Sequence, residues 1–460
     1  MDTLSNSLAA ADIAHTLHPN TNLRAHETNG PLVMARGEGI RVYDDRGKEY
    51  IEGLAGLWSV GVGFSEKRLA DAAYQQMLKL PYYHTFTSKS NEPSIRLAEK
   101  LAEMTPEPLT RAFFTSSGSE ANDTIVKMVW YRSNAMGKPE KKKFLARTKA
   151  YHGITIASGS LTGLPTNHRD FDLPAIPVRH LTCPHFYRFG MEGESEAEFT
   201  ARLLRELEDV IAQEGAETIA AFIGEPLMAA GGVMPPPAGY WEGVERICRA
   251  NDILLVSDEV ICGFGRLGTP FGCQKYGFTP DIMTLSKQIT SSYMPLAAVM
   301  LSEAVYAPIA DNSARLGVFG HGFTASGHPV ATAVALENIA IIEERDLMGN
   351  AARLEQPFQA GLRSFADHPL VGEVRGAGLI GALELVADKA TKRPFEKAGR
   401  AGQIAAAIGH EEGLIFRSIG DQLALCPPMI VTQEDVGEIM TRLGRTLERL
   451  TGAVAAEGLL

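Results

Sequence analysis

The chain has 460 residues, of which 45% are hydrophobic and 22% charged, a composition typical of a soluble globular protein with a sizeable core. Its 44 Lys and Arg residues against 55 Asp and Glu residues give a formal net charge of −11. This balance argues against a dedicated nucleic-acid binder, because such proteins normally present a basic face. A chain of this length is expected to form two domains.

The beginning of the chain predicts no export signal. The segment from Met1 to Ser7 has neither the basic nor the apolar stretch of a signal peptide. Elsewhere no uninterrupted apolar run approaches the roughly 18–20 residues needed to span a membrane. We therefore predict a cytoplasmic protein.

Three segments follow one another along the chain. Residues 1–64 form a polar arm to about residue 30 and then a hairpin, Ile40–Ile51, and they are expected to contribute to a small domain. Across residues 65–335, strand-like runs such as 253–258 and 282–286 alternate with helical stretches. This alternation predicts a large α/β domain with a mostly parallel sheet covered by helices on both faces. Residues 336–460 predict a small α+β domain, with antiparallel strands in 372–386 and an amphipathic helix at 433–450.

The cysteines and histidines predict no metal site. The five cysteines are odd in number and widely spaced: Cys183, Cys248, Cys262, Cys273 and Cys426. This pattern favours buried free thiols over disulfides or structural zinc. His321 and His328 lack the spacing of a zinc-protease helix, and His152 is expected to hydrogen-bond locally.

A glycine-rich segment, Gly263–Gly268, matches the G-x-G-x-x-G pattern and follows a predicted strand. However, Thr269 and Pro270 come next, where a dinucleotide site requires a helix N-terminus for the pyrophosphate. We therefore predict a glycine-rich loop and no dinucleotide site.

A second candidate anion site is Thr115–Asn122, which reads Thr-Ser-Ser-Gly-Ser-Glu-Ala-Asn between a predicted strand and a predicted helix. Small residues with free backbone N–H groups and hydroxyls at a helix N-terminus suit a phosphate. An ordinary capped helix start explains the same residues equally well.

Two charged residues end buried strands. Asp258 follows the apolar run 253–256, and in open α/β sheets ligands bind beyond such strand ends. A buried carboxylate there could face a protonated ring nitrogen, although a metal ligand or a salt-bridged Asp is the simpler alternative. Lys287 follows the run 281–286, where lost hydration would make its amine a nucleophile for a Schiff base. A solvated lysine is the alternative. A phosphate cradle, an Asp and a Lys in this order are what pyridoxal 5'-phosphate (PLP) requires.

The chain resembles the class III (omega) aminotransferases of the fold type I PLP superfamily over about residues 30–450. Six motifs in the family's order carry the resemblance: Ser117–Asn122, Tyr151–Gly153, Gly224–Pro226, Val256–Val260, Leu285–Lys287 and Gly320–Pro329. Within the family, residues 57–63 and 286–295 are most similar to the pyruvate-dependent amine transaminases. The resemblance implies a mostly parallel seven-stranded sheet flanked by helices, plus a smaller α+β domain.

The resemblance also implies roles for individual residues. Lys287 would hold PLP as a Schiff base and then move the proton in a ping-pong mechanism, while Asp258 would keep the pyridine nitrogen protonated. The implied cofactor-binding residues are Ser117, Gly118, Ser119, Tyr151, Glu225, Asp258, Val260, Lys287, Phe323 and Thr324. Among them, Thr324 would reach the phosphate of a neighbouring subunit, which implies a homodimer with shared active sites, or a tetramer.

Four residues are implied on the substrate side. Arg417 would grip the carboxylate of the keto acid through paired, charge-assisted hydrogen bonds. Trp58, Phe86 and Tyr151 would wall the pockets, with core packing as the alternative for Trp58 and Phe86.

The implied reaction transfers an amino group from a primary amine or omega-amino acid to a keto acid. The resemblance favours pyruvate, although Arg417 would hold 2-oxoglutarate as well. Beta-alanine, taurine or a polyamine are alternative donors. Dialkylglycine-type decarboxylation and amino-group shifts within one molecule, as in aminomutases, are more remote alternatives on the same fold.

Overall fold

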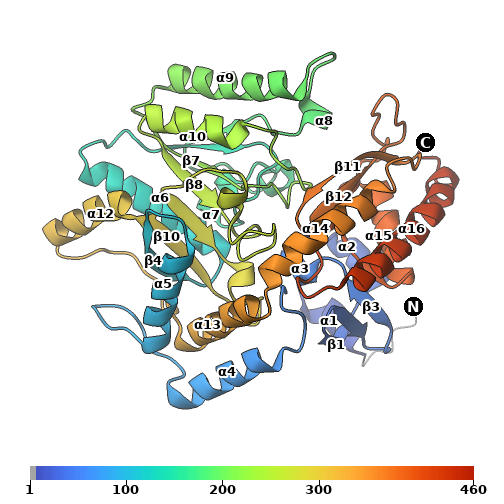
Figure 1. Cartoon of the computed structure of the whole chain (residues 1–460), viewed down its shortest axis with the longest axis horizontal. Coiled ribbons are helices and arrows are strands. Elements are labelled where there is room, and N and C mark those ends of the chain that lie inside the picture. Colours follow the sequence, from blue (N-terminus) through green and yellow to red (C-terminus); the bar gives the residue numbers. More distant parts are fainter. Residues whose placement is uncertain (1–6) are drawn as a thin grey trace.

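The computed structural model describes residues 7–460 and has a large and a small part (Figure 1). A central sheet covered by helices forms the large part, and the first and last segments of the chain come together in the small part. The chain divisions expected at residues 64 and 335 remain predictions.

The central sheet is seven-stranded, with the order β4-β10-β9-β8-β7-β5-β6. Its strands are β4 (Leu109–Thr115), β5 (Lys143–Arg147), β6 (Val178–Leu181), β7 (Ile219–Gly224), β8 (Leu254–Asp258), β9 (Ile282–Leu285) and β10 (Ala297–Ser302). Every pairing among β5 to β9 is parallel, whereas β10 runs antiparallel to both β4 and β9. The mostly parallel sheet expected from the sequence is therefore confirmed.

Alternating side chains of these strands enter two separate cores, because successive residues of a strand point to opposite faces. In β8, Leu255 packs into one core, while Leu254 and Val256 pack into the other. The first core is covered by α5 (Glu92–Met104), α9 (Glu196–Glu214), α10 (Tyr240–Ala250) and α13 (Pro329–Glu344). The second is covered by α6 (Gly118–Ala135), α7 (Ile156–Leu161) and α12 (Glu303–Leu316). Buried apolar residues on both faces explain the continuous hydrophobic runs of these strands.

Two four-stranded sheets build the small part. One contains β1 (Met34–Glu38), β2 (Arg41–Asp44), β3 (Glu49–Glu52) and β13 (Leu414–Ile415). The other contains β11 (Val371–Ala377), β12 (Ile380–Leu385), β15 (Gln422–Leu425) and β14 (Arg417–Ile419). Since β3 pairs in parallel with β13, the expected N-terminal hairpin joins a strand from the far end of the chain.

The remaining helices complete the two parts. They are α1 (Leu8–His15), α2 (Leu23–Asn29), α3 (Ala55–Trp58), α4 (Lys67–Lys79), α8 (Phe186–Phe189), α11 (Gly272–Lys275), α14 (Leu347–Arg363), α15 (Arg400–Glu411), α16 (Gln433–Ala456) and the 3₁₀ turns η1 (Pro165–Asn167) and η2 (Lys287–Ile289). Among residues 7–460, no helix combines the length and apolarity required to cross a membrane.

The structure refines two expectations. The expected arm contains two short helices, α1 and α2, begun by the side-chain caps Ser7 and Asn22, and its first six residues lie outside the described part. The closing helix α16 continues beyond residue 450 to Ala456, because Leu450 and Val454 are buried against the small part. All five cysteines are free and buried, as predicted.

Candidate active site

Most of the predicted site residues meet at one edge of the central sheet. Because β4 and β9 both run antiparallel to β10, β4 points the same way as β5, β7, β8 and β9. The carboxyl ends of these five strands therefore share an edge, where an open sheet binds its ligands. The predicted site residues that end or follow these strands are Ser117–Ser119, Tyr151, Glu225, Asp258 and Lys287.

Asp258 is anchored by three hydrogen-bond partners. Its side chain ends β8, and the residue is only 3% exposed. The side-chain amide of Asn122 donates to Oδ2 over 2.9 Å, and Nδ1 of His152 lies 2.8 Å from the same oxygen. The backbone N–H of Val260 donates to Oδ1 over 3.2 Å. These contacts fix the orientation of a carboxylate that has lost most of its hydration.

Sequence reasoning missed this anchoring network. Asn122, fully buried in α6, also donates to the carbonyl of His152 over 2.6 Å and accepts from the hydroxyl of Thr284 over 2.7 Å. The expectation that His152 would bond locally is wrong for its side chain, which contacts a residue 106 positions away. Asn122 stood inside a recognised motif, but nothing in its local pattern indicates that it faces Asp258.

Lys287 begins the 3₁₀ turn η2 directly after β9 and Ser286. Its φ of 48° lies in the left-handed region, where non-glycine residues are uncommon and often mark functional sites. Burial lowers the pKa of Lys287 from its ordinary value, while the charges of Asp258 and Glu225 oppose this change. The neutral amine, which is the nucleophilic form, is therefore easier to form here than in an exposed lysine.

The start of α6 combines a cap with a tightly packed cradle. Ser117 caps the helix by accepting from the N–H of Glu120 over 3.2 Å, so the capping interpretation of the motif is confirmed. A Cβ at Gly118 would lie 3.1 Å from Val260 Cγ2, and one at Gly153 would lie 2.7 Å from Ser119 Oγ. The backbone here leaves no room for larger residues, and α6 directs its free first-turn N–H groups towards this place, as an anion site requires.

The loops after β5 and β7 are joined by Glu225. Its carboxylate accepts from the backbone N–H of Tyr151 over 3.0 Å and from that of Ala229 over 3.2 Å. Burial raises the pKa of Glu225, while the nearby His152 opposes this rise. The fully buried glutamate therefore holds the segment that carries Tyr151 in place.

Arg417 lies in β14 of the small part but interacts electrostatically with the residues at the sheet edge. Burial raises the pKa of Tyr151, and the charge of Arg417 opposes this rise. The same guanidinium contributes to lowering the pKa of Lys287. The tertiary structure therefore brings this cation from the second half of the chain to the predicted site.

The pocket residues differ in their surroundings. Trp58 is 1% exposed and packs with Leu227 and Ala229, so core packing accounts for most of its surface. Phe86 is 46% exposed, which excludes core packing within this chain. Its ring lies against the loop of Gly322, where a Cβ would lie 3.0 Å from Phe86 Cζ.

Phe323 and Thr324 belong to the same loop. Phe323 is half-buried, and Thr324 is exposed, with its carbonyl accepting from the hydroxyl of Tyr82 over 2.9 Å. This bond ties the loop to the segment before α5, and it leaves the Thr324 side chain at the surface.

A lysine and an aspartate at the ends of neighbouring parallel strands, beside a capped helix start, define the site of a PLP-dependent enzyme of the mostly parallel α/β type. The family model "Aminotransferase class-III" matches residues 23–447. The chain belongs to this family and is a PLP-dependent aminotransferase.

Named relatives and solved structures agree with this family. The gamma aminobutyrate transaminase 3, chloroplastic, of Solanum lycopersicum is 47% identical, with 97% of this chain and 87% of the relative covered. The vanillin aminotransferase of Capsicum annuum is 46% identical, covering 91% of each chain. The omega transaminase of Pseudomonas jessenii in complex with PMP has a TM-score of 0.96 and 58% identity over 98% of this chain and 99% of that one.

The residues present fit PLP. The glycine cradle at the start of α6 can receive a phosphate, and the buried Asp258 carboxylate suits a protonated ring nitrogen, since its hydrogen-bond partners among residues 7–460 are Asn122, His152 and a backbone N–H. Lys287 offers an amine whose lowered pKa favours covalent attachment to an aldehyde.

Proposed function

We propose that this aminotransferase moves the amino group of a primary amine or an omega-amino acid to a keto acid, with pyruvate as the acceptor. The observation that carries this proposal is the meeting of Lys287, Asp258 and Arg417 around Tyr151, since the charges of Asp258 and Arg417 both act on the pKa values of Tyr151 and Lys287. One site then combines the amine of Lys287, which reacts, with the guanidinium of Arg417, which binds a carboxylate.

The proposed cofactor contacts follow from this placement. Ser117, Gly118 and Ser119 bind the phosphate at the start of α6, and the partner subunit's copy of the loop Phe323–Thr324 adds to them. Tyr151 and Val260 hold the two faces of the ring, Asp258 binds its nitrogen, and Glu225 supports the segment of Tyr151. The exposed position of Thr324 favours its reaching a neighbouring subunit.

When bound, PLP would supply an aldehyde for the donor's amino group and a ring that accepts the electrons of the donor's breaking C–H bond. Lys287 would hold the cofactor covalently at rest, and its Nζ would move the proton from the donor carbon during the reaction. Asp258, held by Asn122 and His152, keeps the ring nitrogen protonated throughout. Two half-reactions share these groups, which gives ping-pong kinetics.

Arg417 binds the carboxylate of the keto acid. Burial lowers the pKa of its guanidinium, with Tyr151 opposing, but an arginine remains charged because its ordinary value is so high. A partly dehydrated guanidinium forms strong paired bonds with a carboxylate. Any omega-amino acid donor would use the same contact.

Trp58, Phe86 and Tyr151 limit the size of the donor. The names of relatives favour both donor types, since gamma aminobutyrate is an omega-amino acid and vanillin is the aldehyde of an arylmethyl amine. An omega transaminase variant engineered for asymmetric synthesis of enantiopure bulky amines, 57% identical with a TM-score of 0.96, is named W58M/F86L/R417L. These residue types and numbers coincide with Trp58, Phe86 and Arg417 here.

We also propose a homodimer with shared active sites. Exposed apolar and aromatic residues near the Thr324 loop support this assembly, among them Tyr82, Tyr83 and Phe86. A location in the cytoplasm remains a prediction, because the plant relatives are named as chloroplastic or mitochondrial proteins.

A single half-reaction tests the proposed function. The PLP-loaded enzyme is mixed with excess phenylethylamine without keto acid, and the yellow band of the bound cofactor is followed. We expect bleaching, release of acetophenone, and return of the band on addition of pyruvate. A Lys287→Ala variant should show neither the original band nor turnover.

Other results would redirect the proposal. Bleaching only with omega-amino acids would restrict the donor to molecules with a carboxylate. Recovery with 2-oxoglutarate alone would exclude pyruvate as the acceptor. Release of carbon dioxide from a dialkyl amino acid, without bleaching by any amine, would overturn the proposed reaction while leaving the family unchanged.

A further inference from the structure

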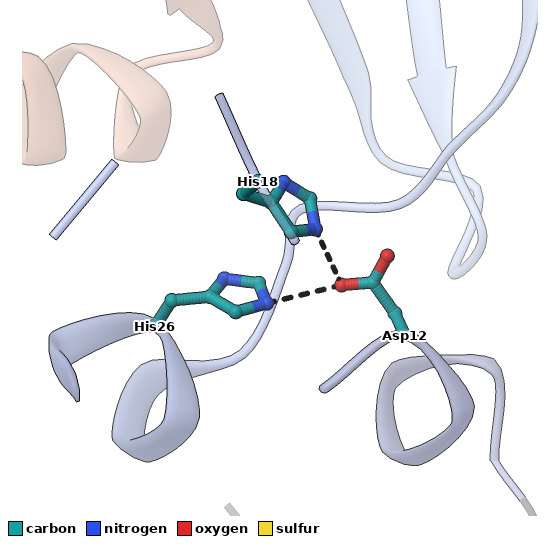
Figure 2. A group of neighbouring side chains, drawn as sticks. All are labelled: Asp12, His18 and His26. Carbon is teal, nitrogen blue, oxygen red and sulfur yellow. Dashed lines mark hydrogen bonds and ion pairs between the residues drawn. The ribbon is translucent and has the colours of Figure 1, made fainter. Parts of the chain in front are cut away.

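The N-terminal arm holds a group of potential metal ligands outside the active site (Figure 2). Asp12 lies in α1, His18 in the turn that follows, and His26 in α2. The Nε2 atoms of His18 and His26 lie 2.7 and 3.1 Å from the same oxygen, Oδ2 of Asp12. Figure 2 shows both imidazole rings converging on this carboxylate from one side.

The three side chains are arranged much as ligands are around a bound cation. The three ligand atoms lie within 4.8 Å of one another, and the two ring centroids are 4.1 Å apart. In a tetrahedral zinc site with bonds of about 2.0–2.1 Å, neighbouring ligand atoms are about 3.3 Å apart. The distances from Oδ2 of Asp12 to the two Nε2 atoms, 2.7 and 3.1 Å, are about 0.6 and 0.2 Å shorter than this, so an outward shift of the side chains would admit an ion.

We propose that Asp12, His18 and His26 bind a divalent cation of the zinc type, with water as a further ligand. Two imidazoles and one carboxylate are a donor set that suits zinc. The side chains of Asp12 and His18 are 23% and 28% exposed, and that of His26 is 9% exposed. The site is therefore open to an ion from solvent on one side and closed by protein on the other.

A second cluster shows why this group is the better candidate. His185, Glu373 and Glu384 are equally close together, but the guanidiniums of Arg188 and Arg375 already bind these carboxylates. A cation there would face two fixed positive charges. The carboxylate of Asp12, in contrast, is paired with His18 and His26. No Arg or Lys side chain among residues 7–460 lies within ion-pair distance of it.

The proposed ion would join the two helices of the arm. Asp12 and His26 belong to different helices, and His18 lies in the segment that connects them. A cation bound to all three residues would close this turn and restrict its opening, as metal sites that link short elements do. Local opening of the arm should therefore become rarer when zinc is bound.

Zinc binding by the tag-free, PLP-loaded enzyme tests the proposal. After treatment with a chelator, the protein is dialysed against Zn²⁺ and the bound metal is measured. We expect one Zn²⁺ per chain, and binding weakened at least about tenfold by Asp12→Asn, His18→Asn or His26→Asn. His15→Asn is the matched control, because His15 is exposed at the end of α1 and should leave binding unchanged.

The cysteine thiols should not contribute to the zinc that is measured, because all five cysteines are buried. The phenylethylamine half-reaction should be the same in every variant, which shows that each one folds. Failure of the unaltered enzyme to bind stoichiometric zinc would overturn the proposal, as would binding that survives all three ligand substitutions.

Tryptic cleavage after Arg24 gives a second readout. Arg24 is exposed in α2, two residues before His26. At zinc about ten times above its Kd, cleavage that requires opening of the arm should slow by about tenfold. The His18→Asn variant should lose this protection, and equal protection in that variant would contradict the proposed site.

Discussion

At the scale of single residues, Asp258 depends on neighbours that perform no chemistry themselves. Asn122 and His152 both bind Oδ2, and Thr284 in turn binds Asn122. The two partners of Oδ2 lie on different elements, α6 and the loop after β5, and Thr284 on β9 fixes the amide of Asn122. We infer that these residues position Asp258 for its proposed contact with the ring nitrogen.

The substitution Asn122→Ala should lower kcat by roughly 10- to 100-fold, because a hydrogen bond to a charged group contributes about 1.5–3 kcal/mol. The KM for the amine should change little, since Asn122 is buried behind Asp258. Steady-state kinetics check this expectation. Asn350→Ala is the control: it removes amide bonds to the carbonyls of Met429 and Val431, and should leave kcat unchanged.

Substitution of Arg417 should affect one half-reaction and spare the other. Arg417→Leu removes the proposed paired bonds to the acceptor carboxylate, so the KM for pyruvate should rise by roughly 10- to 100-fold. Bleaching by phenylethylamine, which has no carboxylate, should persist. The KM of the Arg417→Lys variant for pyruvate should lie between those of the wild-type and Arg417→Leu enzymes, because lysine keeps the charge but not the planar guanidinium. Equal loss of both half-reactions would exclude this role.

At the scale of elements, several buried ionisable groups lie at the ends of strands, among them Glu52 and Asp258. Glu52 ends β3 and is 6% exposed, with its carboxylate accepting from the backbone N–H of Leu54 over 3.0 Å. Burial raises the pKa of Glu52 from 4.5 to about 7. The protonated form is thus favoured in the folded state, and folding becomes less favourable as this proton is lost.

This shift predicts a pH dependence of stability. Relative to Glu52→Gln, the wild-type enzyme should lose up to about 3 kcal/mol of unfolding free energy as the pH rises from about 4.5 to about 7, and the difference should stay constant above that. The substituted amide keeps an oxygen that can accept from the Leu54 N–H. Denaturation midpoints at pH 5 and pH 8 measure the effect, with Glu38→Gln as an exposed control in the same sheet. A difference independent of pH would contradict the prediction.

At the scale of the whole molecule, one buried ion network joins the large and small parts. Arg375 of β11 binds Glu373 and Glu384 over 2.5 and 2.6 Å. It also donates to the carbonyls of Gly232 and Val233, in a loop of the large part, over 2.6 and 2.8 Å. The relative position of the two parts, and hence of Arg417 and Lys287, depends on such contacts.

The substitution Arg375→Met should therefore destabilise the enzyme by about 3–5 kcal/mol, because it removes the buried cation that Glu373 and Glu384 share, although Arg188 still binds Glu384. Unfolding by urea at saturating PLP measures the loss. Arg353→Met breaks an exposed pair with Asp346 and should cost about 1 kcal/mol or less. Equal effects of the two substitutions would show that the Arg375 network is not structural.

The sequence by itself determined the elements and the strand ends. Periodicity and apolar runs are local properties, so β8, β9 and the β11–β12 pair were predicted within a few residues of their observed bounds. Asp258 and Lys287 were placed correctly at the ends of strands for the same reason. The motif order of these residues was sufficient to predict the family.

Only the tertiary structure decided which distant residues meet. Asn122, His152 and Asp258 come from three elements, and Asp12, His18 and His26 follow no spacing typical of a metal site. Their contacts depend on how helices pack on the sheet and on one another, which local patterns do not specify. For the same reason, the approach of Arg417 to Tyr151 became visible only once the two parts of the chain were assembled.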